Sequence, residues 1–176
     1  AVKVGLVKFP AFEYVGDLVC ADVGIVKKLR SKIEKGDFVI DSIVARNVLP
    51  GRERDSHKGT FGTVLVAGGS VNYPGAPVFS ARSAYQIGAG LVKTAVPERI
   101  YEAVVGNCLE STWLILDDEN GVIAESAIKV IMKELSQVDC VILGPGIGRE
   151  DTTLRFIHGL FDMSKEKNTP KKMGLI

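Results

Sequence analysis

Two glycine-bearing loops hold the residue types and the spacing that could do chemistry. The first runs from Gly68 to Ala76 (GGSVNYPGA), and the second is residues 144–148 (GPGIG). Glycine allows the polar groups of a ligand to approach the main chain, and free N–H groups at the start of a following helix attract anions. We therefore predict ligand binding at both loops. For the first loop, the alternative is a tight turn between a strand and a helix that binds nothing.

Neither loop matches a standard nucleotide motif. Compared with G-x-G-x-x-G, the third glycine of residues 144–148 comes one place too early, and no acidic residue is well placed about 20 positions later. The phosphate-binding motif G-x-x-x-x-G-K-[ST] is absent, because Lys58-Gly59-Thr60 has the reversed order. Residues 55–62 could contact phosphate. We favour a structural role for them, because they precede a predicted strand rather than follow one.

The other reactive side chains do not form a catalytic motif. His57 and His158 are too far apart in the sequence to imply a shared site, and His158 lies on a predicted helix as a surface or hydrogen-bonded histidine. No Ser–His–Asp or Cys–His pairing can be argued. The acidic run at residues 117–119 predicts a solvated turn rather than a metal site. The sequence therefore assigns no catalytic residue and no metal ligand.

The composition excludes several classes of protein. The 176 residues carry 22 Lys and Arg against 21 Asp and Glu, so we expect neither nucleic acid nor a membrane surface as a partner. With 46% hydrophobic residues, the chain is globular rather than disordered. No apolar stretch reaches the roughly 20 residues of a membrane-spanning helix, and the N-terminus lacks a signal-peptide pattern. Cys20, Cys108 and Cys140 are odd in number and widely spaced, which predicts buried free thiols and a reducing, cytoplasmic location.

The elements that must position the two loops alternate between strand and helix patterns. Short apolar runs, typical of strands buried on both faces, occur at residues 63–67, 91–96, 113–116 and 140–143. Helical spacing occurs at residues 76–86, 98–105, 124–135 and 152–161. This alternation predicts an α/β fold with a largely parallel sheet covered on both faces. In such sheets ligands bind outside the carboxyl ends of the strands, where both glycine loops lie.

The two ends of the chain depart from this alternation. Residues 2–7 and 18–25 are apolar enough for strands, and residues 40–49 predict a short helix that begins near Asp41 or Ser42. Residues 164–172 predict a polar loop. The chain begins at Ala1 without Met. Its last four residues, MGLI, have a pattern typical of the beginning of a strand. We therefore expect a fragment of a longer protein.

Five motifs occur in a fixed order: SHKGTFG at 56–62, VLVAGGS at 64–70, PGA at 74–76, GAGLV at 88–92 and GPGIG at 144–148. Together they resemble the opening of the ADP- or ATP-dependent NAD(P)H-hydrate dehydratases. Residues 1–28, with FP, EYVGDL and ADVGI, resemble the tail of the NAD(P)H-hydrate epimerase domain that precedes the dehydratase in bifunctional enzymes. We expect residues 1–30 to be the C-terminal remnant of that epimerase-like α/β domain with a linker. Residues 31–176 would be the N-terminal half of the dehydratase domain, with the boundary near residues 28–36.

The resemblance implies a three-layer α/β/α ribokinase-like fold, of which the chain holds the first half. It also implies a lyase that dehydrates NAD(P)H hydrate to NAD(P)H, with ADP or ATP as co-substrate and Mg²⁺ assisting. Phosphorylation of the ring hydroxyl makes it a better leaving group, which requires positioned phosphate contacts and a cation. By the resemblance, substrate contacts fall at Ala76, Gly144 and Gly146. Further candidates for substrate or nucleotide contacts are Gly69, Ser70, Gly75 and Lys58.

The family's later motifs do not occur in residues 1–176, so we expect the catalytic residue after Ile176 and an inactive isolated fragment. One alternative is a small-molecule kinase of the same fold class, such as a vitamin-precursor kinase. Another is a non-catalytic nucleotide-binding module that ends near Ile176. Because half a sheet leaves an open edge and uncovered apolar surface, we expect a homo-oligomer or a poorly soluble fragment.

Overall fold

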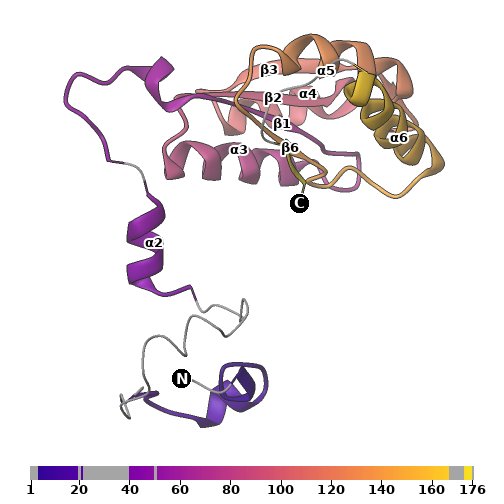
Figure 1. Cartoon of the computed structure of the whole chain (residues 1–176). Helices are drawn as coiled ribbons and strands as arrows, with labels where there is room; N and C mark the ends of the chain where they lie inside the picture. Colours follow the sequence, from indigo (N-terminus) through magenta and orange to yellow (C-terminus); the bar gives the residue numbers. More distant parts are fainter. Residues whose placement is uncertain (1–3, 20, 22–39, 50, 167–172, 176) are drawn as a thin grey trace. The chain divides into compact units, whose positions relative to one another are not determined.

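A computed structural model describes residues 4–19, 21, 40–49, 51–166 and 173–175. The chain divides into two compact units, Ala1–Glu53 and Arg54–Ile176, and each is described by itself (Figure 1). Across the described ranges, no helix is long and apolar enough to cross a membrane.

The first unit contains 3-10 turns and one short α-helix. The turns are η1 (Val4–Leu6) and η2 (Ala11–Tyr14), so the strand predicted at residues 2–7 is wrong over its described part. A strand needs a hydrogen-bonded neighbour, and the described part of this unit holds no strand that could pair with it. The strand predicted at residues 18–25 is absent at its described positions, 18, 19 and 21. Its other residues, and the domain boundary predicted near residues 28–36, lie outside the described ranges.

The short helix of this unit is α2 (Ser42–Val48), as the sequence predicts. Asp41 caps it: the carboxylate oxygen Oδ1 accepts hydrogen bonds from the amides of Ile43 and Val44 at 2.9 and 2.8 Å. Such a cap satisfies backbone donors that have no partner within the helix. The helix therefore begins directly after Asp41, whose side chain can cap it.

The second unit is built on one parallel sheet of five strands in the order β3-β2-β1-β6-β7 (Figure 1). The strands are β1 (Thr63–Ala67), β2 (Leu91–Pro97), β3 (Thr112–Leu116), β6 (Cys140–Leu143) and β7 (Met173–Leu175). All four neighbouring pairs are parallel. The four internal apolar runs and the strand pattern at the end of the chain are thereby confirmed as strands.

Helices cover both faces of the sheet. On one face α3 (Gly75–Ile87) and α4 (Glu98–Val104) pack over strand residues such as Val66 and Val92. On the other face α5 (Ile128–Leu135) and α6 (Asp151–Glu166) pack over Leu65 and Ala67. Figure 1 shows α3 on one side of the sheet and α5 and α6 on the other. Because successive side chains of a strand point to opposite faces, the apolar run of β1 supplies both cores. The predicted three-layer α/β/α architecture is confirmed.

Three element boundaries differ from the prediction. The helix predicted at residues 124–135 begins as a 3-10 turn, η5 (Glu125–Ala127), before α5. The acidic run at residues 117–119, predicted as a solvated turn, contributes strand β4 (Asp118–Glu119) to a small antiparallel hairpin with β5 (Val122–Ile123). Asn120 and Gly121 both have positive φ there, the conformation that tight hairpin turns require. Helix α6 extends to Glu166, so the predicted polar loop is wrong at residues 164–166, and residues 167–172 lie outside the described ranges.

Candidate substrate-binding site

The order of the strands creates a crevice between β1 and β6. From β1 the chain builds β2 and β3 on one side, and it then returns to build β6 and β7 on the other side. The last residues of the two strands, Ala67 and Leu143, are register partners, so the loops that follow begin side by side. Ligands of open α/β sheets bind at the carboxyl edge where the strand order reverses in this way.

The two glycine loops contact each other directly through their backbones. The Gly69 amide donates to the Pro145 carbonyl oxygen at 2.8 Å, and the Gly144 amide donates to the Ala67 carbonyl oxygen at 3.0 Å. A Cβ atom at Gly68 would overlap the Pro145 carbonyl group. Glycine at this position is therefore required for the loops to approach so closely.

Gly146 joins the second loop to the start of α3. Its φ is +67°, and a Cβ atom there would lie 2.7 Å from the Cβ of Tyr73 and 2.8 Å from the Cβ of Ala76. A side chain at this position would be strained by its backbone conformation and would also displace its neighbours. The first turn of α3 thus packs against bare backbone of residues 144–148.

A cavity of about 630 Å³ opens between these segments. This volume lies within the range of small-molecule sites, roughly 300–1,000 Å³. Ala76, Gly144 and Gly146, which the sequence predicts as substrate contacts, all line it. The full lining is Asn72, Tyr73, Ala76, Gly144, Gly146, Ile147, Gly148, Arg149 and Glu150.

Four lining side chains carry polar chemistry, and the sequence singled out none of them as a contact: Asn72 and Tyr73, inside the first predicted loop, and Arg149 and Glu150, directly after the second. Each lies within or directly beside a glycine loop, so adjacency to the loops was the signal that could have found them. No side chain caps α3, whose N-cap residue is Pro74, so its first backbone amides have no intrahelical or capping partner. The cavity therefore combines free backbone donors with an amide, a phenol, a guanidinium and a carboxylate.

The further predicted contacts Gly69, Ser70 and Gly75 lie on the first loop but outside this lining. Gly69 packs against Ile100 and Pro77, and Gly75 lines a smaller cavity of about 260 Å³ between α3 and α4. Ser70 is 1% exposed, and its hydroxyl has no hydrogen-bond partner among the described residues. A buried hydroxyl without a partner is energetically costly, which makes Ser70 an unusual feature of the loop.

Lys58 lies at the other end of β1, on the turn η3 (Lys58–Phe61) that leads into the strand. The His57 imidazole nitrogen Nδ1 accepts from the Gly59 amide at 3.1 Å, and the Thr60 hydroxyl accepts from the His57 amide at 3.3 Å. A Cβ atom at Gly90 would overlap the Lys58 carbonyl group. This geometry favours the structural role for residues 55–62, and a ligand contact by Lys58 stays a prediction.

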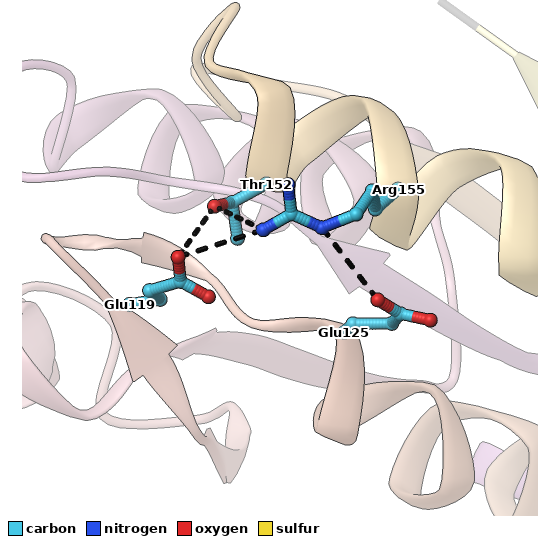
Figure 2. A network of polar contacts seen from close by, with 4 residues as sticks. All are labelled: Glu119, Glu125, Thr152 and Arg155. Carbon is cyan, nitrogen blue, oxygen red and sulfur yellow. Dashed lines mark hydrogen bonds and ion pairs between the residues drawn. The ribbon is translucent and has the colours of Figure 1, made fainter.

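A polar network holds the β4–β5 hairpin against α6 (Figure 2). The Thr152 hydroxyl donates to Glu119 at 3.0 Å, and the Arg155 guanidinium lies 3.5 Å from Glu119 and 3.6 Å from Glu125. A Cβ atom at Gly148 would lie 3.1 Å from Val122 of the same hairpin. The hairpin therefore supports the segment that carries Arg149 and Glu150.

The acidic run at residues 117–119 is engaged in structural contacts. Asp117 accepts from the Ser126 hydroxyl at 2.6 Å, and Asp118 pairs with Arg99 at 3.2 Å. Among the described residues, no group of three or more His, Cys, Asp or Glu could hold a metal ion. His158 is exposed on α6, as predicted for a surface histidine.

Cys108 is not an activated nucleophile. Burial raises the pKa of the Cys108 thiol, and the nearby Glu110 carboxylate raises that pKa further. Because the thiolate is the reactive form, Cys108 is held in the unreactive state. Cys140 is half-buried and also free, and Cys20 lies outside the described residues.

Comparison with known proteins identifies the family. The profile of the NAD(P)H-hydrate dehydratases matches residues 64–170, which contain every lining residue of the cavity. The chain belongs to the NAD(P)H-hydrate dehydratase family. The predicted resemblance is thereby confirmed.

Curated members of the family match most of this chain. The bifunctional NAD(P)H-hydrate repair enzyme Nnr of Dictyoglomus turgidum is 34% identical over 158 residues, which is 88% of this chain and 31% of that protein. The ATP-dependent (S)-NAD(P)H-hydrate dehydratase of Sorghum bicolor is 30% identical over 135 residues, covering 72% of this chain and 35% of its own length. The chain thus spans about a third of the length of the relatives it matches.

The family fold also appears among solved structures. A ribokinase-like superfamily protein of Enterococcus faecalis V583 aligns with 70% of this chain and 40% of its own length. The TM-score is 0.59 at 22% identity. This likeness concerns the fold, and it confirms the predicted ribokinase-like class.

Proposed function

We propose that the second unit is the substrate-binding part of an NAD(P)H-hydrate dehydratase, a lyase that restores NADH or NADPH from its hydrate. The observation that carries this proposal is the cavity at the carboxyl edge of β1 and β6, because Ala76, Gly144 and Gly146 line it together. Family membership and cavity position support the same assignment from separate observations.

The reaction would use ATP or ADP to phosphorylate the hydroxyl of the hydrated nicotinamide ring. Phosphate leaves the ring more readily than hydroxide, and the loss restores the reduced nicotinamide. The name of the Sorghum bicolor relative supports a nucleotide requirement. Mg²⁺ is part of this proposal as the cation of the nucleotide phosphates, since proteins commonly bind it through substrate phosphates with one or two carboxylates.

The cavity would bind and orient the hydrated ring rather than supply the catalytic group. Its carboxylate, Glu150, already accepts from the Arg149 amide at 2.7 Å and from the Thr153 hydroxyl at 3.5 Å. We place the catalytic residue outside residues 1–176. Gly69, Ser70 and Gly75 are proposed to shape the first loop around the ligand.

Residues 1–30 are proposed as the end of an NAD(P)H-hydrate epimerase domain. The motifs FP, EYVGDL and ADVGI in residues 1–28 support this proposal, because they resemble the tail of that domain. A homo-oligomer in the cytoplasm is the setting we propose. It would cover apolar side chains such as Phe79 and Ile87, which are 70% and 71% exposed.

The test uses the complete natural reading frame that contains these residues. The protein is incubated with hydrated NADH, Mg²⁺ and either ATP or ADP, and recovery of the reduced-nicotinamide absorbance is followed. Recovery that needs one nucleotide is the expected result, and it also settles which nucleotide is used. Nucleotide consumption on another acceptor without recovery would favour a small-molecule kinase. If the protein neither restores NADH nor consumes nucleotide, the result would favour a non-catalytic binding module.

A further inference from the structure

Arg149 supplies the basic side chain of the cavity lining. Its side chain is exposed, and within the described part of the chain it makes no hydrogen bond and no ion pair. Two arginines of the neighbouring elements, Arg155 and Arg99, are paired instead. Arg155 pairs with Glu119 and Glu125, and Arg99 pairs with Asp118.

The backbone of Arg149 is held in place although its side chain is free. The Arg149 amide donates to the Glu150 carboxylate at 2.7 Å, and that same carboxylate accepts from Thr153. The preceding residue, Gly148, has a φ of +94° and no room for a Cβ atom between Glu150 and Val122. The backbone that carries the Arg149 side chain is therefore fixed at the cavity wall. The neighbouring Glu150 carboxylate is already hydrogen-bonded to the Arg149 amide and to Thr153.

We propose that Arg149 binds a phosphate group of the nucleotide in this cavity, namely the phosphate ester on the nicotinamide ribose. The planar guanidinium matches a phosphate with two parallel charge-assisted hydrogen bonds. The first turn of α3, which has no side-chain cap, borders the same cavity at Ala76, and a helix N-terminus adds positive potential. This inference rests on the proposed function, because it takes the ligand to be a nicotinamide nucleotide.

The test compares ligands that differ by one phosphate. Reduced nicotinamide mononucleotide and reduced nicotinamide riboside are titrated into the complete protein by calorimetry, and AMP is a third ligand. The variants are Arg149→Ala and Arg149→Lys, with Arg82→Ala as the control for loss of an exposed arginine outside this cavity. We expect the mononucleotide to bind the wild-type protein more tightly than the riboside.

Arg149→Ala is expected to weaken mononucleotide binding about tenfold and to leave the riboside unchanged, since a hydrogen bond to a charged group contributes about that factor. Arg149→Lys should restore part of the loss, and Arg82→Ala should cause none. Equal losses for both nicotinamide ligands, no loss for either, or a wild-type protein without preference for the phosphate would overturn the proposal. Loss confined to AMP would assign Arg149 to the adenine nucleotide and overturn it as stated.

The result also separates this inference from the proposed function. A phosphate preference that depends on Arg149 would stand even if hydrated NADH were not converted. Conversion of hydrated NADH without any dependence of binding on Arg149 would leave the proposed function standing and remove this inference.

Discussion

At the amino ends of β1 and β2, glycine lets one backbone segment rest on another, whereas at the carboxyl ends of β1 and β6 glycine borders a cavity. At the amino edge Gly90 packs on the Lys58 carbonyl group, and its amide donates to the Gly62 carbonyl oxygen at 3.1 Å. At the carboxyl edge the loops also touch, through Gly69 and Pro145, but the space beyond them is open.

The comparison shows that glycine content does not by itself identify a ligand site. Both edges carry motifs of the family, and both use glycine where a Cβ atom would collide with backbone. The two edges differ in how their polar backbone and side-chain groups are hydrogen-bonded. At the amino edge the backbone groups of η3 are tied into a capped turn, whereas at the carboxyl edge the Ser70 hydroxyl and the first amides of α3 have no partner among the described residues.

Substitution at the amino edge should have the largest effect on stability. Gly90→Ala places a Cβ atom on the Lys58 carbonyl group, and relief requires the backbone to move. We expect the free energy of unfolding to fall by about 3 kcal/mol, measured by denaturant unfolding. Gly106→Ala is the matched control, because nothing lies within 4 Å of a Cβ atom there. Equal stability of the two variants would contradict the packing role of Gly90.

Substitution at the carboxyl edge should act mainly on binding. In Gly146→Ala the positive φ and the contact with Ala76 together lower stability by about 2 kcal/mol, and the displaced first turn of α3 narrows the cavity. Binding of reduced nicotinamide nucleotides should then be lost below the melting temperature of the variant, as followed by calorimetry. A folded variant that binds as tightly as the wild-type protein would exclude this cavity as the site.

A substitution with a smaller expected effect at the amino edge is Asp139→Ala. Its carboxylate oxygen Oδ2 accepts from the Thr63 amide at 2.8 Å, where β1 begins. Asp139→Ala should lower the free energy of unfolding by about 1 kcal/mol, because the strand end loses a hydrogen bond. Ligand affinity at the opposite edge should stay the same, and a parallel loss of affinity would show that the two edges are coupled.

The smallest effect is expected for the network of Figure 2. Arg155 is 51% exposed, so Arg155→Ala should change stability by only about 0.5 kcal/mol, because solvent screens such pairs. Amide exchange at residues 149–153 should increase, since the hairpin supports that segment. Unchanged exchange there would remove the supporting role of the network.

Much of the fold could be predicted from the sequence because its strands are short, largely apolar runs, and because glycine directly follows β1 and β6. Buried parallel strands need apolar side chains on both faces, and that requirement is visible in residues 63–67 and 140–143. The N-terminal strand prediction failed because apolar composition cannot show whether a pairing partner exists. The extension of α6 to Glu166 was missed because polar, Lys-rich residues also suit an exposed helix end.

The site could be predicted in part for a similar reason. Glycine loops at strand ends identify the carboxyl edge, and the structure brings Ala76, Gly144 and Gly146 to one cavity there. The roles of Arg149 and Glu150 could not be separated from sequence, because one is free and the other is engaged only through contacts with Thr153 and the backbone. The opposite position of Lys58 likewise follows from strand direction, which places η3 at the amino end.

The most direct test of the difference between the two edges is hydrogen–deuterium exchange of the complete protein with and without a reduced nicotinamide nucleotide. Bound ligand should protect amides in residues 69–76 and 144–150, which form the cavity, and leave residues 57–62 and 88–90 unchanged. Protection at residues 57–62 with no change at the carboxyl edge would contradict the account.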